Sequence, residues 1–70
     1  PGYTFVSQNR ATVDGAAGYD FIYGDEMDKY YEVWFEKNGK FYGITCETLK
    51  ESFDSEKNNF NTIVTSFHVK

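Results

Sequence analysis

The feature that most constrains the fold is the Asn38-Gly39 pair inside residues 30–46, YYEVWFEKNGKFYGITC. Asn and Gly both tolerate positive φ, and strong strand formers flank them, so the pair predicts a β-hairpin closed by a two-residue type I′ turn. Such a loop pairs Lys37 with Lys40, and every pair further out follows from that register. Because side chains alternate with period two, one face of the ribbon is predicted to be apolar. This core face consists of Tyr31, Val33, Phe35, Tyr42, Ile44 and Cys46.

The opposite face of the hairpin mixes aromatic and acidic side chains. Trp34 is expected opposite Gly43, with Phe41 and Tyr30 on the same side. An exposed aromatic patch on a small domain usually marks an interface, so Tyr30, Trp34 and Phe41 are the predicted interface residues, and Ile22 is expected to join them. The alternative is that Trp34 only covers Gly43 across the strand pair, with the rest shielded by Lys and Glu stems.

Two further strands are predicted before the hairpin. Residues 3–13 and 16–24 flank Asp14-Gly15, a second hairpin signal, and an acidic loop follows at 24–29. A two-residue turn there places Arg10 opposite Tyr19, and such polar partners suit an edge strand. In the second strand Tyr19, Phe21 and Tyr23 share one face, and Asp20 and Ile22 share the other. The three turns together predict a four-strand antiparallel meander.

The pattern becomes helical after Cys46. Residues 48–51 match a capping box and predict one helical turn. Residues 54–66 predict the main helix, capped by Asp54 or Ser55 and followed by an extended tail at 67–70. Its apolar stripe consists of Phe53, Phe60, Ile63, Val64 and Phe67. The predicted fold class is α+β, a four-strand antiparallel meander with one C-terminal helix packed on the Val33 and Phe35 face.

Length and charge limit the functions that the chain can have. The chain has 70 residues, which suits a single small domain over 1–70. Its net charge of −4, with scattered basic residues, argues against a nucleic-acid partner. No apolar run approaches the ~18 residues that suggest a transmembrane helix. Because the chain opens at Pro1-Gly2 without an initiator Met, it is expected to be a fragment or a trimmed piece of a longer protein.

Three runs, in this order, resemble the PsbP-like family. They are VDG with YDFIY from Val13 to Tyr23, WFEKNGKFYGIT from Trp34 to Thr45, and FNTIVTSFHV from Phe60 to Val69. The resemblance covers the C-terminal half of a full family domain, without its N-terminal strands and helix. It implies a central antiparallel sheet with helices on both faces. It also implies relatives that are thylakoid-lumen subunits of photosystem II or, in bacteria, secreted or lipid-anchored proteins of unknown role.

No catalytic, cofactor-binding or metal-ligating set emerges. The acids Asp20, Asp25, Glu26 and Asp28 are the calcium candidates, but their spacing departs from the D-x-D-x-D-G pattern, so a solvated loop is predicted. Cys46 falls on the core face and is predicted to be a buried, inert thiol, so no disulfide and no compartment follow from it. His68 is predicted to be a tail residue without a catalytic or ligand role.

Two functional hypotheses follow. The first is a non-enzymatic binding or assembly module of an exported bacterial protein, extracellular or at the cell surface, which acts through its aromatic sheet face; a cytoplasmic location stays open. The partner is another protein, a second copy or a missing N-terminal half of the domain, and Lys29, Lys37 and Lys40 are expected to offset the acids of that face. The alternative is a small-molecule-binding or enzymatic domain. Its pocket is lined by Tyr19, Tyr23, Tyr30 and Trp34.

Overall fold

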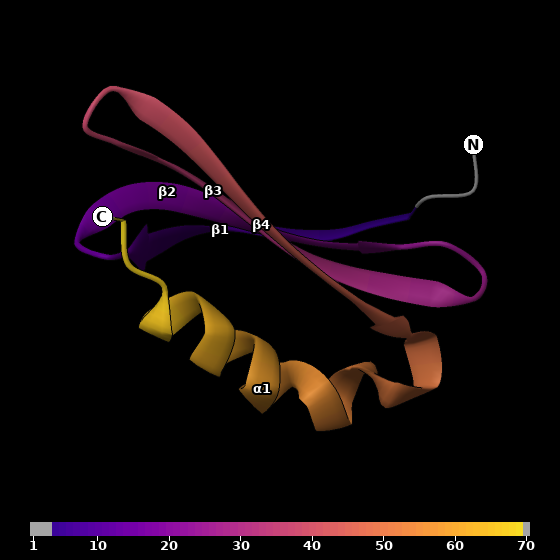
Figure 1. The fold of residues 1–70 in the computed structure, drawn as a ribbon. Coiled ribbons are helices and arrows are strands. Elements are labelled where there is room, and N and C mark those ends of the chain that lie inside the picture. The colour runs from indigo at the N-terminus through magenta and orange to yellow at the C-terminus, as the bar shows by residue number, and fades with distance from the viewer. Residues whose placement is uncertain (1–3, 70) are drawn as a thin grey trace.

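The computed structural model describes residues 4–69, apart from the side chains at positions 5 and 6. A four-stranded antiparallel sheet of order β1-β2-β3-β4 carries one long helix across one face, which confirms the predicted α+β meander (Figure 1). Tyr3, at the predicted start of the first strand, and Lys70, at the end of the tail, lie outside the described residues. The elements are β1 (Thr4–Val13), β2 (Ala16–Gly24), β3 (Asp28–Lys37), β4 (Lys40–Leu49), the 3-10 turn η1 (Lys50–Ser52) and α1 (Phe53–Ser66).

Both predicted two-residue turns are present, and they set the register. Asn38 and Gly39 have φ of 56° and 80°, and Asp14 and Gly15 have φ of 51° and 78°. Positive φ at both central residues is what a type I′ turn requires, and it matches the twist of the flanking strands. Lys37 therefore pairs with Lys40, and the pairs further out follow as predicted, Val33 with Ile44 and Trp34 with Gly43 among them.

The connection between β2 and β3 is shorter than predicted. The expected loop at 24–29 is reduced to 25–27, because β3 already begins at Asp28. Asp25 closes the loop: its Oδ1 accepts hydrogen bonds from the backbone N–H of Met27 (2.9 Å) and of Asp28 (2.7 Å). The short loop fixes a register in which Tyr23 lies opposite Tyr30.

Helix α1 begins one residue earlier than predicted, and its predicted caps do not form. Thr48 is paired with Lys29 in the sheet, so the expected capping box gives way to the 3-10 turn at Lys50–Ser52. Ser52 occupies the N-cap position without a side-chain hydrogen bond, and Ser55 instead donates to the Ser52 carbonyl at 2.8 Å. The helix is therefore held mainly by packing, as expected for a segment of low intrinsic propensity.

The core lies between α1 and the sheet in two clusters. The first cluster is Val13, Val33, Phe35 and Val64, and the second cluster is Cys46, Phe53 and Phe60. Ile63, predicted to be in the apolar stripe, is 49% exposed, because the helix face against the sheet is centred on Phe60 and Val64. Phe67 follows the helix in extended backbone and packs edge-on against Phe35, with ring centroids 5.7 Å apart.

Candidate functional site

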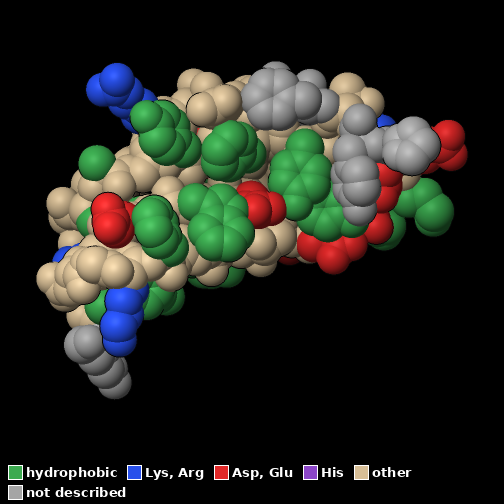
Figure 2. All heavy atoms as spheres, turned by 90° about the horizontal axis from the view of Figure 1, so that it is seen from above, with side chains coloured by type: hydrophobic (Ala, Val, Ile, Leu, Met, Phe, Trp, Pro, Cys, Tyr) green, Lys and Arg blue, Asp and Glu red, His purple; other side chains and the backbone are tan. Residues whose placement is uncertain are grey.

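The sheet face turned away from α1, here called the open face, is rich in aromatic side chains. Within residues 4–69 no helix covers it (Figure 1), and Figure 2 shows hydrophobic side chains gathered along it with acidic ones among them. Strand register assigns to it Tyr19, Phe21, Tyr23, Tyr30, Trp34 and Phe41. Phe41 is 76% exposed, and Tyr19 and Trp34 are each 47% exposed. A contiguous exposed apolar patch of this kind is typical of an interaction surface.

The predicted interface residues Tyr30, Trp34 and Phe41 all lie on the open face, but Ile22 does not. Ile22 packs against the second core cluster on the α1 side of the sheet. Its placement was predicted wrongly because the pairing of β2 with β3 puts it opposite Tyr31, a core-face residue. Tyr19, Phe21 and Tyr23 take the positions on the open face instead.

Glu32 holds two of the open-face rings in place. One carboxylate oxygen accepts a 2.7 Å hydrogen bond from the Tyr23 hydroxyl, and the other accepts a hydrogen bond from the indole N–H of Trp34. Tyr23 also stacks on Tyr30, with ring centroids 4.8 Å apart. Trp34 lies over Gly43, where an added Cβ would come within 2.8 Å of its ring. The indole therefore covers Gly43, as the alternative interpretation held, and still presents about half of its surface to solvent.

The open face is acidic. Among the described residues, strand alternation assigns to it Arg10, Asp28, Glu32, Glu36 and Glu47. The lysines expected to offset these acids lie on the other face, so that prediction is wrong. The Lys29 ammonium sits 4.7 Å from the centroid of the Phe53 ring, Lys37 forms an ion pair with Asp14, and Lys40 is opposite Lys37. The reason is register, since odd-numbered residues of β3 face the helix.

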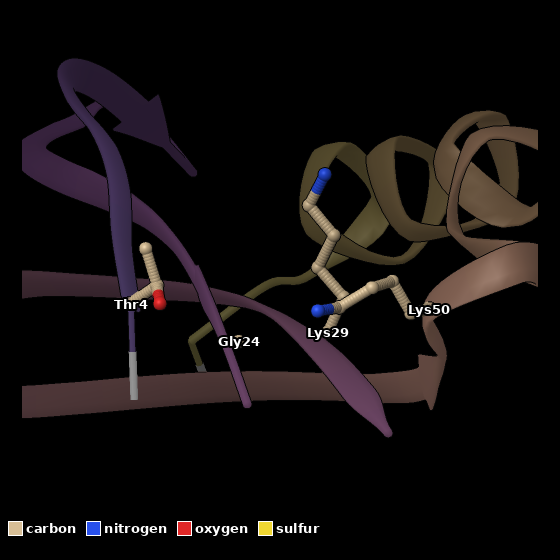
Figure 3. Close-up of a pocket in the computed structure, with 4 residues that line it drawn as sticks. All are labelled: Thr4, Gly24, Lys29 and Lys50. Atoms are coloured by element: carbon tan, nitrogen blue, oxygen red, sulfur yellow. The ribbon is translucent and has the colours of Figure 1, made fainter. Parts of the chain in front are cut away.

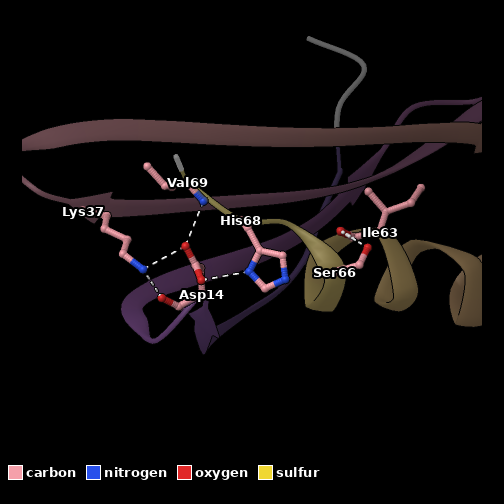
Figure 4. A network of polar contacts seen from close by, with 6 residues as sticks. All are labelled: Asp14, Lys37, Ile63, Ser66, His68 and Val69. Atoms are coloured by element: carbon pink, nitrogen blue, oxygen red, sulfur yellow. Dashed lines mark hydrogen bonds and ion pairs between the residues drawn. The ribbon is translucent and has the colours of Figure 1, made fainter.

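A polar network at the turn between β1 and β2 anchors the end of the chain (Figure 4). One carboxylate oxygen of Asp14 accepts from the Lys37 ammonium at 2.8 Å and from the backbone N–H of Val69 at 2.8 Å. The other lies 3.0 Å from Nδ1 of His68. The hydrogen bond from Lys37, and then those from Val69 and His68, hold the pKa of the Asp14 carboxyl well below its usual range. No local pattern in the sequence indicates this network, because Asp14 is more than 20 residues from each of its partners along the chain.

A second feature of note is a shallow hollow of about 250 Å³ at the far end of the sheet. It is lined by Thr4, Gly24, Lys29 and Lys50, which Figure 3 shows together; the first three lie on β1, β2 and β3, and Lys50 begins η1. Lys29 is already engaged by the Phe53 ring, and the backbone N–H of Lys50 donates to the Met27 carbonyl at 2.9 Å. These contacts are structural, since they close the loop end of the sheet onto the start of α1.

Two titratable side chains of the core face, Tyr31 and Cys46, have raised pKa values. Burial, and then the charge and hydrogen bond of Asp20, raise the pKa of Tyr31 to about 12. The Tyr31 hydroxyl donates to Asp20 Oδ2 at 3.1 Å, whereas Asp20 Oδ1 is buried without a partner in the described part of the chain. Burial also raises the pKa of the Cys46 thiol, so the thiolate that nucleophilic chemistry needs is disfavoured.

The remaining candidates from the sequence are dispersed. Asp20 lies on the core face, while Asp25 is used to close the loop, so the acids considered for calcium do not converge. Within residues 4–69 no group of three or more His, Cys, Asp and Glu side chains is placed to hold a metal. His68 is exposed and contacts only Asp14 among the described polar groups.

A family model described as PsbP-like protein matches residues 1–69. The chain belongs to the PsbP-like family. Members of this family are generally non-catalytic. No curated protein and no solved structure shows a significant match to this PsbP-like chain. No helix in the described residues of this domain is long and apolar enough to cross a membrane.

Proposed function

We propose that this PsbP-like chain is a non-enzymatic binding module whose open face docks a protein partner that presents basic side chains on an apolar surface. The observation that carries the proposal is the exposure of Tyr19, Trp34 and Phe41 on one uncovered sheet face, while the core is built on the other. In these sheets one face normally packs on a core and the other is polar and solvated. An aromatic second face is therefore best explained by something that covers it.

The gain from covering the face is large enough to support binding. An aromatic side chain carries about 150–250 Å² of surface, so the 76% of Phe41 that is exposed is worth about 3–5 kcal/mol at ~25 cal/mol per Å². Trp34 and Tyr19 add smaller amounts, because about half of each is already covered. Association entropy and side-chain ordering offset part of this gain. The net result supports a specific but weak to moderate interaction.

Charge favours a basic partner over a second copy of the chain. Each open face carries four carboxylates and one guanidinium among its described residues. Two such faces brought together would place like charges against each other, whereas a basic partner would neutralise them. Four strands ~4.8 Å apart and ~30 Å long present roughly 600 Å², which is less than the ~800 Å² per partner of a standard interface. A transient complex fits this area.

We further propose that the module belongs to an exported bacterial protein and acts outside the cytoplasm. The support is the PsbP-like membership, together with the secreted or lipid-anchored bacterial relatives that the family resemblance implies. Cell fractionation of the full-length protein tests this part. Recovery in the cytoplasmic fraction, with no signal peptide cleaved, would contradict it.

A small-molecule site is the second candidate. Its specific support is that Tyr19, Tyr23, Tyr30 and Trp34 do share the open face. The rings of Tyr23 and Tyr30, however, stack on each other, so they do not enclose a cavity between them. A thermal-shift screen with metals and common metabolites separates the two candidates, since a reproducible stabilisation of several degrees would favour the small-molecule site.

The docking proposal is tested with Phe41→Ser and a matched control, Met27→Ser. Both positions are highly exposed, at 76% and 70%, but Met27 lies in the loop between β2 and β3, off the face. Proteins captured on the immobilised chain are purified one by one, and the dissociation constant of each is measured against the wild type and both variants. We expect at least one partner whose binding weakens about tenfold or more in Phe41→Ser only, as for a hot-spot side chain.

Sedimentation of the wild type and of Trp34→Ser at high micromolar concentration tests whether a second copy of the chain covers the open face instead. A dimer that is lost in Trp34→Ser would show that a second copy covers the face, and the external partner would be wrong. The proposal would also be overturned if every captured partner bound Phe41→Ser with the same affinity as Met27→Ser and the wild type. A monomer whose Trp34 emission is already blue-shifted would show that the indole is covered by its own chain.

A further inference from the structure

The open face contains a hollow with a specific chemistry. It has a volume of about 280 Å³, and the residues that line it include, besides Ala17, Gly18 and Phe35, the four residues Tyr19, Trp34, Glu36 and Phe41. These four residues come from three neighbouring strands, with Tyr19 opposite Trp34 and Glu36 opposite Phe41. Figure 2 shows this side of the molecule, where acidic side chains lie among the hydrophobic ones.

The rings around this hollow stand apart from one another. Tyr23 and Tyr30 are stacked 4.8 Å apart further along the face, whereas within residues 4–69 none of Tyr19, Trp34 and Phe41 forms a ring–ring pair. Each of the three rings keeps an exposed surface that a ligand can reach, although the indole of Trp34 lies over Gly43. Trp34 is held in position by its hydrogen bond to Glu32 and by its contact with Gly43, so the indole wall is fixed before binding.

Glu36 supplies a carboxylate that is not engaged by another described side chain. It is exposed, and no hydrogen bond or ion pair joins it to another residue between 4 and 69. Arg10 lies on this face opposite Tyr19 and lines an adjoining hollow on the β1 side, which shares Ala17, Gly18 and Tyr19 with the hollow at Glu36. Among the residues that line the hollow at Glu36 there are several aromatic residues, one acid without an ion-pair partner in the described chain, and no Lys or Arg.

We propose that this hollow binds the guanidinium group of an arginine side chain presented by the protein partner. Aromatic faces attract cations through their quadrupole, and arginine is the cation most often found on them. Its planar guanidinium also stacks on rings while donating hydrogen bonds to a carboxylate, which a lysine ammonium does less well. The inference rests on the proposed docking function and deepens it by naming the side chain that the face recognises.

The probe is N-acetyl-arginine amide, with N-acetyl-citrulline amide as the matched neutral control. Each is titrated into the isotope-labelled wild-type chain at low ionic strength, and amide and indole signals are followed by NMR. We expect saturable shifts centred on Tyr19, Trp34 and Phe41 with the arginine compound and much smaller shifts with citrulline. Added salt should weaken the effect, because the charges involved are solvent-exposed.

Two variants, Glu36→Gln and Phe41→Leu, separate the contributions of the carboxylate and of the aromatic ring to arginine binding. Glu36→Gln should weaken arginine binding about threefold, the loss expected for an exposed charge pair, while Glu51→Gln in η1 makes the same charge change off the face and should leave it unaltered. Phe41→Leu keeps an apolar side chain but removes the π face, and should also weaken binding about threefold. Circular dichroism melts check that each variant is folded.

Three results would overturn the inference. These are equal shifts with citrulline, shifts that rise linearly over the whole surface without saturation, or unchanged arginine binding in Glu36→Gln. The failure is distinguishable from failure of the docking function. If Phe41→Ser abolishes binding of a protein partner but the arginine compound gives no saturable shift, the docking function is supported and only the arginine assignment is wrong.

Discussion

Replacing Phe60 with Ala is the sharpest test of how α1 is held on the sheet. Phe60 is 8% exposed and belongs to the second core cluster, with its ring centroid 5.9 Å from that of Phe53. Deleting the ring removes buried area and leaves a cavity that the rigid strands of the sheet fill only in part.

The magnitude follows from the buried area. A phenyl side chain buries about 150–250 Å², worth ~4–6 kcal/mol at ~25 cal/mol per Å². A denatured chain that already hides about a fifth of this area lowers the gain to roughly 3–5 kcal/mol, the range of measured Phe→Ala losses. A domain of this size has a total stability of only about 3–5 kcal/mol, so we expect Phe60→Ala to be largely unfolded in water.

The assay is urea unfolding, followed by circular dichroism and by Trp34 fluorescence. Ile63→Ala, on the same helix but 49% exposed, is the matched control and should stay close to the wild type. Phe60→Leu keeps most of the volume and should fall between the two. If Phe60→Ala unfolds cooperatively near the wild-type midpoint, or no lower than Ile63→Ala, the packing of α1 against β3 and β4 is not what stabilises the fold.

Three further predictions concern the turns and the titratable groups. Gly39→Val forces a β-branched residue to φ near 80° and should cost about 1–3 kcal/mol in urea unfolding; parental stability would contradict the turn type. The lowered pKa of Asp14 contributes stability above its ordinary pKa of 3.8 that is lost as pH falls, so the stability gap between wild type and Asp14→Asn should shrink in acid; a gap independent of pH would refute the network. The raised pKa of Tyr31 contributes stability that is complete below pH 10 and is lost toward pH 12. The free energy of unfolding of the wild type should therefore fall relative to that of Tyr31→Phe when both are measured across that pH range.

The open face was only partly predictable, for a physical reason. The Asn38-Gly39 turn fixes its own hairpin, so the positions of Tyr30, Trp34 and Phe41 followed from counting residues outward. No such marker exists between Gly24 and Asp28, and a longer loop was expected there. Without the pairing of β2 to β3, the sequence leaves open which face of the second strand joins Trp34.

The helix shows the same division. Of the predicted apolar stripe, Phe53, Phe60 and Val64 are buried, whereas Ile63 is 49% exposed. The helix start was displaced because Thr48, which looked like a cap, is taken by strand pairing with Lys29. A capping motif is a local preference, and the hydrogen bonds of the sheet prevailed over it.

Local chemistry in the sequence thus determined the elements, both two-residue turns, the strand order and which residues of the β3–β4 hairpin face the core, because positive-φ residues and period-two patterns act over a few residues. Only the tertiary structure decided which charges face the aromatic surface, and that the end of the chain returns to the β1–β2 turn. Lys37 meets Asp14 across 23 positions, and Val69 meets it across 55. Contacts at such separations depend on how the sheet and helix pack as a whole, and no run of neighbouring residues specifies them.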